Sequence, residues 1–161
     1  MATDYGQRLA RVSDISLKLN ATESAILRDL VEQMRALVKE SDTADPVRAR
    51  LFPDAYEDKE EAESYREMTG GDLSALKLEA LDRVAESLGR RGSTRIVLNQ
   101  EGAEAWVRAL TDMRLAIGTR LGVTEDTMDR EPDSSDPDFA AVQTLHWLGW
   151  LQERILEKMV P

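Results

Sequence analysis

The sequence EGAEAWVRALTDMRLAIGTRL, residues 101–121, decides the fold because its apolar side chains recur at the spacing of one face of an α-helix. A second stretch, residues 72–90, has the same period. Two long helices that pack by these faces are therefore expected. The first face consists of Trp106, Val107, Leu110, Met113, Ile117 and Leu121, and the second of Leu73, Leu76, Ala80, Leu81, Val84 and Leu88.

One basic residue lies within each apolar face, Arg114 in the first and Lys77 in the second. A cation on a core-facing side of a helix needs a compensating interaction. Each could form an ion pair with an acid of a neighbouring helix, or its long side chain could reach the surface. Alternatively, both cations could line a pocket that receives an anionic ligand. The chain has 31 Asp and Glu residues that could supply ion-pair partners.

Three further charged residues of the same stretch, 101–121, carry an expectation about their role. Arg120 lies at the edge of the apolar face near the expected C-terminus of the helix, where a cation interacts favourably with the helix dipole. Arg108 and Asp112 are four residues apart. We expect them to form a solvent-exposed pair on the opposite face.

Two short strands are expected beside the helices. Residues 13–19 and 95–98 are apolar at alternate or successive positions, and we expect them to pair as a minimal sheet that the helices back. Asn20 and Asn99 follow them as helix caps, and Glu23 completes a capping box. The fold class is therefore mainly α, with four to six helices and a two-stranded element. The helices are expected over residues 21–41, 46–51, 58–68, 72–92, 100–121 and 137–159.

A single domain is expected over residues 13–160, preceded by a flexible N-terminal segment, 1–12. Residues 123–138 form an acidic loop within that domain. The loop lacks the glycine and the terminal glutamate of an EF-hand, so we predict no metal site there.

Composition narrows the functional classes. The formal net charge of −10 repels phosphate backbones, so direct nucleic-acid binding is not expected. The chain has no Cys, which excludes disulfides and thiolate chemistry, and its single His makes a zinc site unexpected. No apolar run reaches the roughly 18 residues of a membrane span, and residues 1–12 lack the apolar core of a signal peptide. We expect a cytoplasmic protein with no cofactor.

The last helix carries a candidate partner surface. Its first half is apolar on nearly every side, which is typical of a helix that is central or covered by a partner. Trp147, Trp150 and Leu151 are the candidate interface residues, since Trp is enriched at protein interfaces. A homodimer through this helix is one arrangement, and burial of the tryptophans in the core is the other. His146 is expected to be a satisfied core or boundary residue rather than a general base.

Three segments carry a family resemblance: LFPDAY at residues 51–56, EAWVRALTDMRLAIGTRLGV at 104–123 and WLGWLQ at 147–152. They resemble an actinobacterial family known as domain of unknown function 2017, and the similarity extends over about residues 13–159. The family pattern includes Tyr65, Arg66, Lys77, Arg114 and Arg120. We take Arg66, Lys77, Arg114 and Arg120 as candidate binding residues.

The resemblance implies a role but no enzyme activity. Family members often lie in the genome beside the adaptor of the Clp protease, and one is described as an oxidative-stress transcription regulator that acts through thiols and a sigma-factor partner. That thiol mechanism cannot operate in a chain without Cys. We expect a non-enzymatic protein-interaction or regulatory domain that binds a protein partner of transcription or proteolysis. The alternative is a small-anion or metabolite-binding domain that uses Lys77 and Arg114.

Overall fold

The structure, a computed structural model, describes residues 14–39, 45–52, 71–122 and 133–159. Within these ranges the chain forms five helices and two strands, which confirms a mainly α fold with a minimal sheet. The elements are β1 (Ile15–Leu19), α2 (Ala21–Lys39), α3 (Pro46–Leu51), α5 (Gly71–Leu88), β2 (Thr94–Leu98), α6 (Gln100–Leu121) and α8 (Phe139–Met159).

Several sequence expectations lie outside the described residues. They are the N-terminal segment 1–12, the helix over 58–68 with Arg66, and the part of the acidic loop over 123–132. Two helix starts differ from the sequence prediction. Helix α5 begins at Gly71 rather than after a cap at Asp72, and α8 begins at Phe139 rather than at 137.

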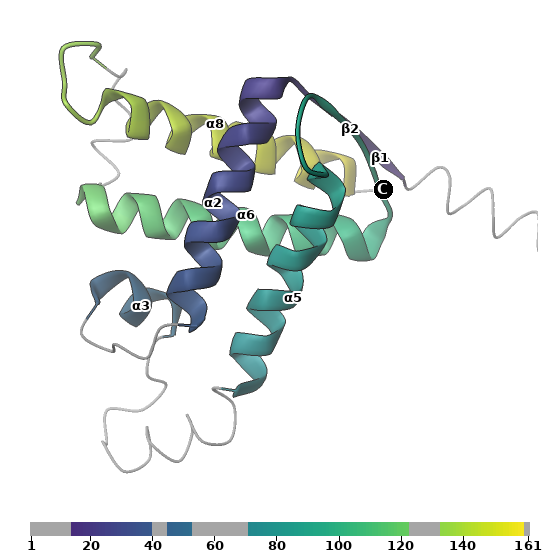
Figure 1. Cartoon of the computed structure of the whole chain (residues 1–161), viewed down its shortest axis with the longest axis horizontal. Coiled ribbons are helices and arrows are strands. Elements are labelled where there is room, and N and C mark those ends of the chain that lie inside the picture. The colour runs from purple at the N-terminus through teal and green to yellow at the C-terminus, as the bar shows by residue number, and fades with distance from the viewer. Residues whose placement is uncertain (1–13, 40–44, 53–70, 123–132, 160–161) are drawn as a thin grey trace, which may run out of the picture.

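The helices form two crossing pairs (Figure 1). Helices α2 and α5 lie side by side, and this pair crosses the pair formed by α6 and α8. Helix α6 packs against α3, α5 and α8, so it is the central element of the described structure. Its side chains Trp106, Leu110 and Met113 are completely buried. The stretch with helical periodicity, residues 101–121, therefore forms the middle of the core.

The two helix caps expected from the sequence are present. The backbone N–H of Glu23 donates to Asn20 Oδ1 at 2.8 Å, and the N–H of Asn20 donates to Glu23 Oε1 at 2.9 Å, which completes the capping box. Asn99 caps α6 by accepting from the N–H of Gly102 at 2.8 Å. Gly122 ends α6 in the left-handed conformation, at a φ of 65°.

Strands β1 and β2 pair with each other, as the sequence predicts, and the structure shows that they run antiparallel in a two-stranded ribbon. One face of the ribbon packs on the helices through Ile15, Leu17, Leu19, Ile96 and Leu98, which are all buried. The other face is open to solvent. It carries Ser16 opposite Val97 and Lys18 opposite Arg95.

An arginine that the sequence did not single out joins α2 to the end of α5 and to the turn that leads into β2. Arg28 of α2 donates to the carbonyl oxygens of Leu88 at 2.8 Å, Gly89 at 3.1 Å and Gly92 at 3.1 Å. It thereby satisfies carbonyl groups at and just after the C-terminal end of α5. These groups receive no backbone N–H from a following turn of the helix. One predicted core position is wrong. Leu76 on α5 is 40% exposed, because its side of the helix is not covered by another described element.

We expect the substitution Asn99→Ala to lower the free energy of unfolding by about 1 kcal/mol, because it removes the side-chain acceptor at the start of α6. Chemical denaturation of both proteins measures the change. The substitution Gln100→Ala, at an exposed neighbouring position, is the control and should change stability by less than about 0.5 kcal/mol. Equal effects of the two substitutions would contradict a capping role for Asn99.

Candidate functional site

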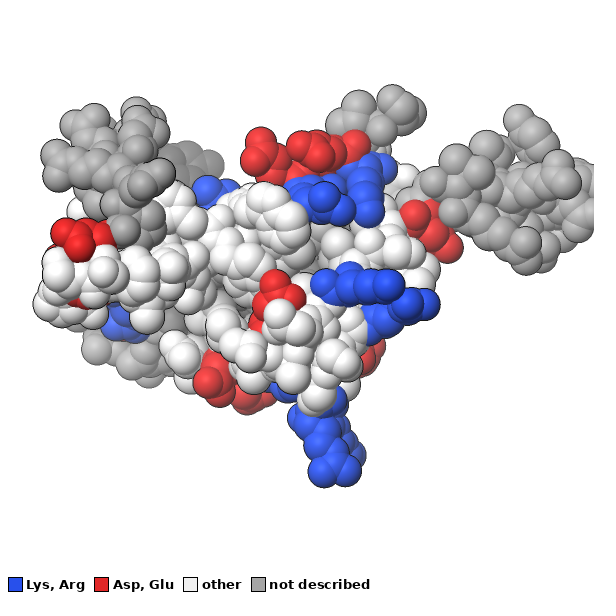
Figure 2. Space-filling model, turned by 90° about the horizontal axis from the view of Figure 1, so that it is seen from above, with Lys and Arg blue, Asp and Glu red and all other residues white. Residues whose placement is uncertain are grey.

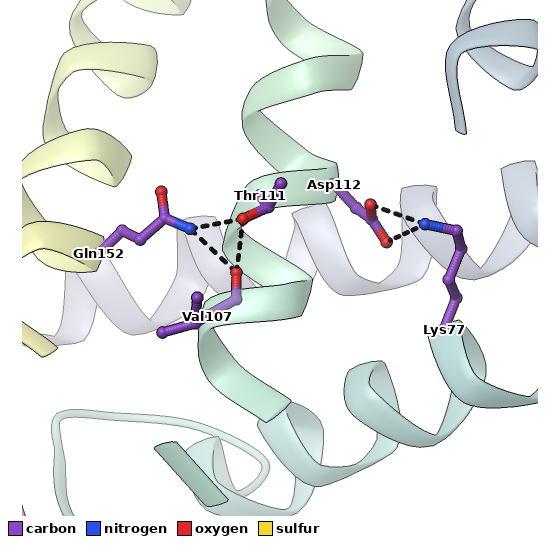
Figure 3. A network of polar contacts seen from close by, with 5 residues as sticks. All are labelled: Lys77, Val107, Thr111, Asp112 and Gln152. Atoms are coloured by element: carbon purple, nitrogen blue, oxygen red, sulfur yellow. Dashed lines mark hydrogen bonds and ion pairs between the residues drawn. The ribbon is translucent and has the colours of Figure 1, made fainter. Parts of the chain in front are cut away.

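Lys77 forms a largely buried ion pair between α5 and α6. Its Nζ lies 2.9 Å from Asp112 Oδ1 and 3.1 Å from Asp112 Oδ2, and the two side chains are only 15% and 10% exposed. Figure 3 shows Asp112 pointing from α6 directly toward the end of the lysine side chain. The ammonium group also lies 5.8 Å from the centre of the Phe52 ring. Of the three arrangements open for Lys77, the structure has the internal ion pair.

Two opposing effects act on the pKa of Asp112 in this pair. Burial raises the pKa of Asp112 above its ordinary value of 3.8, and the hydrogen bonds and charge of Lys77 oppose that rise without cancelling it. The expectation that Asp112 pairs with Arg108 on a solvent face is wrong. Asp112 faces α5 and is 7% exposed, whereas Arg108 is exposed. The spacing of charged residues along a helix does not show whether a carboxylate is buried against a neighbouring helix or exposed to solvent.

The opposite side of α6 holds a second polar cluster, centred on Gln152 of α8 (Figure 3). Gln152 Nε2 donates to the carbonyl oxygen of Val107 at 3.0 Å and to Thr111 Oγ1 at 2.6 Å. Gln152 Oε1 accepts from Arg114 Nη1 at 2.6 Å. Gln152 is 6% exposed, so its side chain joins α6 to α8 within the core. Sequence reasoning missed this residue, although it lies on the same face of α8 as Leu148, Leu151 and Ile155.

Arg114 therefore forms its hydrogen bond with the side-chain amide of Gln152 and not with a carboxylate among the described residues. Among the described residues it forms no ion pair, so the pairing with an Asp or Glu, one of the three arrangements left open for it, is not seen there. Its Nε is buried and has no hydrogen-bond partner within the described ranges. The guanidinium group lies against the backbone of α8 at Gly149, where a Cβ would come within 3.4 Å of Nη2. Glycine at 149 thus allows the arginine to lie close against α8.

A shallow groove of about 470 Å³ runs over this arginine along α8. His146 lines it, together with Trp150 and Leu156, which are 53% and 43% exposed. The Nε2 of His146 and the Nε1 of the neighbouring Trp147 are buried without hydrogen-bond partners among the described residues, so the expectation of a satisfied histidine is wrong for this atom. The described lining residues include no serine, threonine or other nucleophile to pair with the imidazole.

The other candidate residues lie apart from this cluster. Arg120 is 59% exposed at its side chain, and its Nη2 lies 3.7 Å from Oδ2 of Asp45, the residue that caps α3. Trp147 is partly buried against the core, whereas Trp150 is half exposed on α8. Leu151 is 2% exposed, so it belongs to the core and presents almost no surface to a partner. Of the three proposed interface residues, only Trp150 is therefore substantially exposed to solvent.

The described residues contain no group of three His, Asp or Glu side chains arranged to hold a metal ion. Within the same ranges, no helix has the length and apolar character needed to cross a membrane.

The fold and the site define a small helical domain with buried polar clusters on both sides of a central helix. The chain belongs to the family described as "Domain of unknown function (DUF2017)", whose pattern matches residues 6–159. It is also similar to a Mycobacterium leprae protein named "Putative oxidative stress regulator AosR". The two are 26% identical over 126 residues, which cover 70% of this chain and 57% of the relative, little more than half of its length. No solved structure matches the fold.

We expect the substitution Lys77→Met to lower the free energy of unfolding by about 3 kcal/mol at neutral pH, because it leaves the carboxylate of Asp112 buried without its cation. The loss should shrink as the pH falls toward 4. Burial raises the pKa of Asp112 above 3.8 in the folded wild type although Lys77 opposes the rise, and the variant lacks that opposition, so its folded-state pKa is higher still. Acid therefore favours folding more strongly in the variant than in the wild type, and the difference in stability between them narrows.

Urea denaturation across this pH range measures both effects. The double substitution Lys77→Met with Asp112→Leu is the control, because it removes both charges and should be within about 1 kcal/mol of the wild type, or more stable. A double variant as unstable as Lys77→Met at neutral pH would contradict the account of an uncompensated charge.

Proposed function

We propose that this protein is a non-enzymatic interaction domain of a cytoplasmic regulatory system, and that it binds a protein partner through the exposed side of α8. The observation that carries the proposal is the exposure of Trp150, at 53%, beside Leu156, at 43%, on the same helix. Half-exposed tryptophans flanked by grooves are typical anchors of protein interfaces.

Trp150 lies where two grooves meet. It lines the groove over Arg114 on one side and, on the other, a groove of about 510 Å³ beside β1. A partner that covers this tryptophan can therefore extend in either direction along the surface. Hollows next to an apolar anchor provide the shape complementarity that a specific interface needs.

Two observations support a binding role in place of catalysis. Lys77 is paired with Asp112, so it is not free to bind a substrate anion. The groove that contains His146 offers no nucleophile among its described lining residues. The regulatory part of the proposal rests on the name of the relative, which is that of a regulator, and on membership of the same family.

A different protein is a better occupant of this surface than a second copy of the chain. Each copy carries a formal net charge of −10, and two such molecules repel each other over the distances at which association begins. A partner of lower or opposite charge is free of this repulsion. We therefore favour a heterologous complex over the homodimer through α8.

The test is affinity capture of partner proteins from a lysate of the native host, with the wild type and with a Trp150→Ala, Leu156→Ala variant as baits. We expect the specifically bound protein to be lost with the variant, because truncation of a central anchor costs about 2 kcal/mol or more of binding free energy. The variant should unfold at nearly the wild-type temperature, since both side chains are largely exposed.

Leu76→Ala is the matched control, because Leu76 is 40% exposed on a different helix. It should capture the same partner as the wild type. Equal capture by all three baits would exclude this side of α8 as the binding surface. Light scattering on the purified protein reports separately whether a second copy occupies the surface.

A second candidate function, small-anion binding, is favoured by Arg114. Its guanidinium group borders the groove on α8, and no group in the described part of the chain forms a hydrogen bond with its Nε. Lys77 does not contribute, because it lies on the other side of α6, against Asp112. A monovalent carboxylate or phosphate is the ligand class that a single guanidinium group recognises.

Thermal denaturation with added inorganic phosphate or acetate tests this second function. If the site binds the anion, the melting temperature should rise by about 3–6 °C at an anion concentration of about ten times the Kd. Arg114→Met should abolish that rise, whereas Arg120→Met, which changes an exposed arginine, should retain it. A shift that survives both substitutions would show that the anion acts elsewhere.

A further inference from the structure

The groove beside β1 differs in charge from the rest of the molecule. It has a volume of about 510 Å³ and lies between β1 and α8. Three cations line it, Lys18, Arg95 and Arg154, against a single acid, Glu23. Glu23 Oε1 already accepts the backbone N–H of Asn20 in the capping box. A chain with a formal net charge of −10 therefore presents a cationic groove.

These cations have no ion-pair partners among the described residues. Arg154 instead lies over the ring of Trp150, with its Cζ 5.2 Å from the ring centre, and the two side chains form the α8 wall of the groove. Lys158, one turn further along α8, donates to the carbonyl oxygen of Ser16 at 3.3 Å. Figure 2 shows that the larger basic patches on this face lie toward the end of the molecule where Figure 1 draws β1 and β2.

One contact within the ribbon is unfavourable in the free protein. Lys18 and Arg95 are direct cross-strand partners on the exposed face, and like charges in this position destabilise a strand pair. An acid at either position would make the ribbon more stable. The arrangement is useful only if both positive charges act on something outside the chain.

The outer edge of β1 faces the same groove. Because Lys158 reaches the carbonyl oxygen of Ser16, that carbonyl points toward α8 and away from β2. Backbone groups of alternate residues in an antiparallel pair face the same side, so the N–H and C=O of Lys18 point the same way. Among the described residues no second strand pairs with this edge, and such an edge can accept an added strand from another chain.

We infer that the groove between β1 and α8 binds an extended acidic segment of a partner protein. The segment lies along the edge of β1 and pairs with its backbone. Its Asp or Glu side chains meet Lys18, Arg95 and Arg154, and an apolar side chain packs on Trp150. This inference rests on the proposed function and names the chemistry of the partner.

The strand edge favours a peptide over a nucleic acid. Backbone N–H and C=O groups in alternation are the complement of another peptide backbone and not of a phosphate chain. A long polyanion would also meet the repulsion of the whole molecule, whereas a short acidic segment meets mainly the local cations.

The experiment selects ligands from a library of random linear peptides displayed on phage, with the full chain as the target. The best peptide is then synthesised with a fluorescent label and titrated by fluorescence anisotropy. We expect the selected peptides to be rich in Asp and Glu around an apolar residue. Their binding should weaken as salt is raised, because the cations of the groove are exposed.

Three variants locate the site. Arg154→Glu and Arg95→Glu should each weaken binding by about tenfold or more, because each sets a like charge against the acidic peptide. Arg95→Glu should also melt at or above the wild-type temperature, because it replaces the unfavourable pair with Lys18. Arg108→Glu makes the same change in net charge at an exposed residue that lines neither groove, and it should bind as the wild type does.

Several results would overturn the inference. It fails if the library yields no acidic peptide, if Arg108→Glu weakens binding as much as Arg154→Glu, or if a single-stranded oligothymidine displaces the peptide from the groove. Peptides that depend on Leu156 but not on Arg95 or Arg154 would refute the acidic groove and leave the proposed function of α8 standing. Equal capture of the protein partner by all three baits, together with acidic peptides whose binding Arg154→Glu weakens, would refute the proposed role of Trp150 and Leu156 and leave the acidic groove standing.

Discussion

The structure depends on the position of α6 between α3, α5 and α8, where Trp106, Leu110 and Met113 are completely buried. Polar groups on the covered sides of this helix need partners from neighbouring helices, whereas Arg108 and Arg120 are exposed to solvent. Asp112 forms an ion pair with Lys77 of α5, and the hydroxyl oxygen of Thr111 accepts a hydrogen bond from Gln152 of α8. These two contacts point to opposite sides of α6 and fix its rotation between its neighbours. The apolar contacts supply most of the driving force, and the polar ones restrict how the helices can be arranged.

Much of this architecture is readable in the sequence because it depends on local rules. The period of residues 101–121 predicts α6 with its observed end at Leu121, and Asn20 with Glu23 predicts the start of α2. Alternation identifies β1, and pairing with β2 is expected because each strand has one apolar face to bury, whereas the antiparallel direction is known only from the structure. These features involve residues a few positions apart, where spacing alone carries the information.

The candidate site was only partly predictable, for the opposite reason. Lys77 was recognised as a cation that needed a partner, but the identity of Asp112 depends on how α5 and α6 are rotated against each other. Gln152 and Gly149 were not recognised, because an amide or a missing side chain matters only where another helix comes close. Trp150 and Leu151 are neighbours in the sequence with opposite surroundings, one half exposed and one in the core. A helix that is apolar on all sides does not indicate which side is covered.

The pairing of β1 with β2 also has a consequence for folding. Leu19 faces Thr94, so the ribbon closes a chain segment that contains α2, α3 and α5. Closing so long a loop is entropically costly and slow, whereas α2 and α5 can meet over a shorter stretch of chain. The helices should therefore assemble first and the ribbon last. Any surface built on the outer edge of β1 then exists only in the fully folded molecule, so newly made or partly unfolded chains would not compete for whatever binds there.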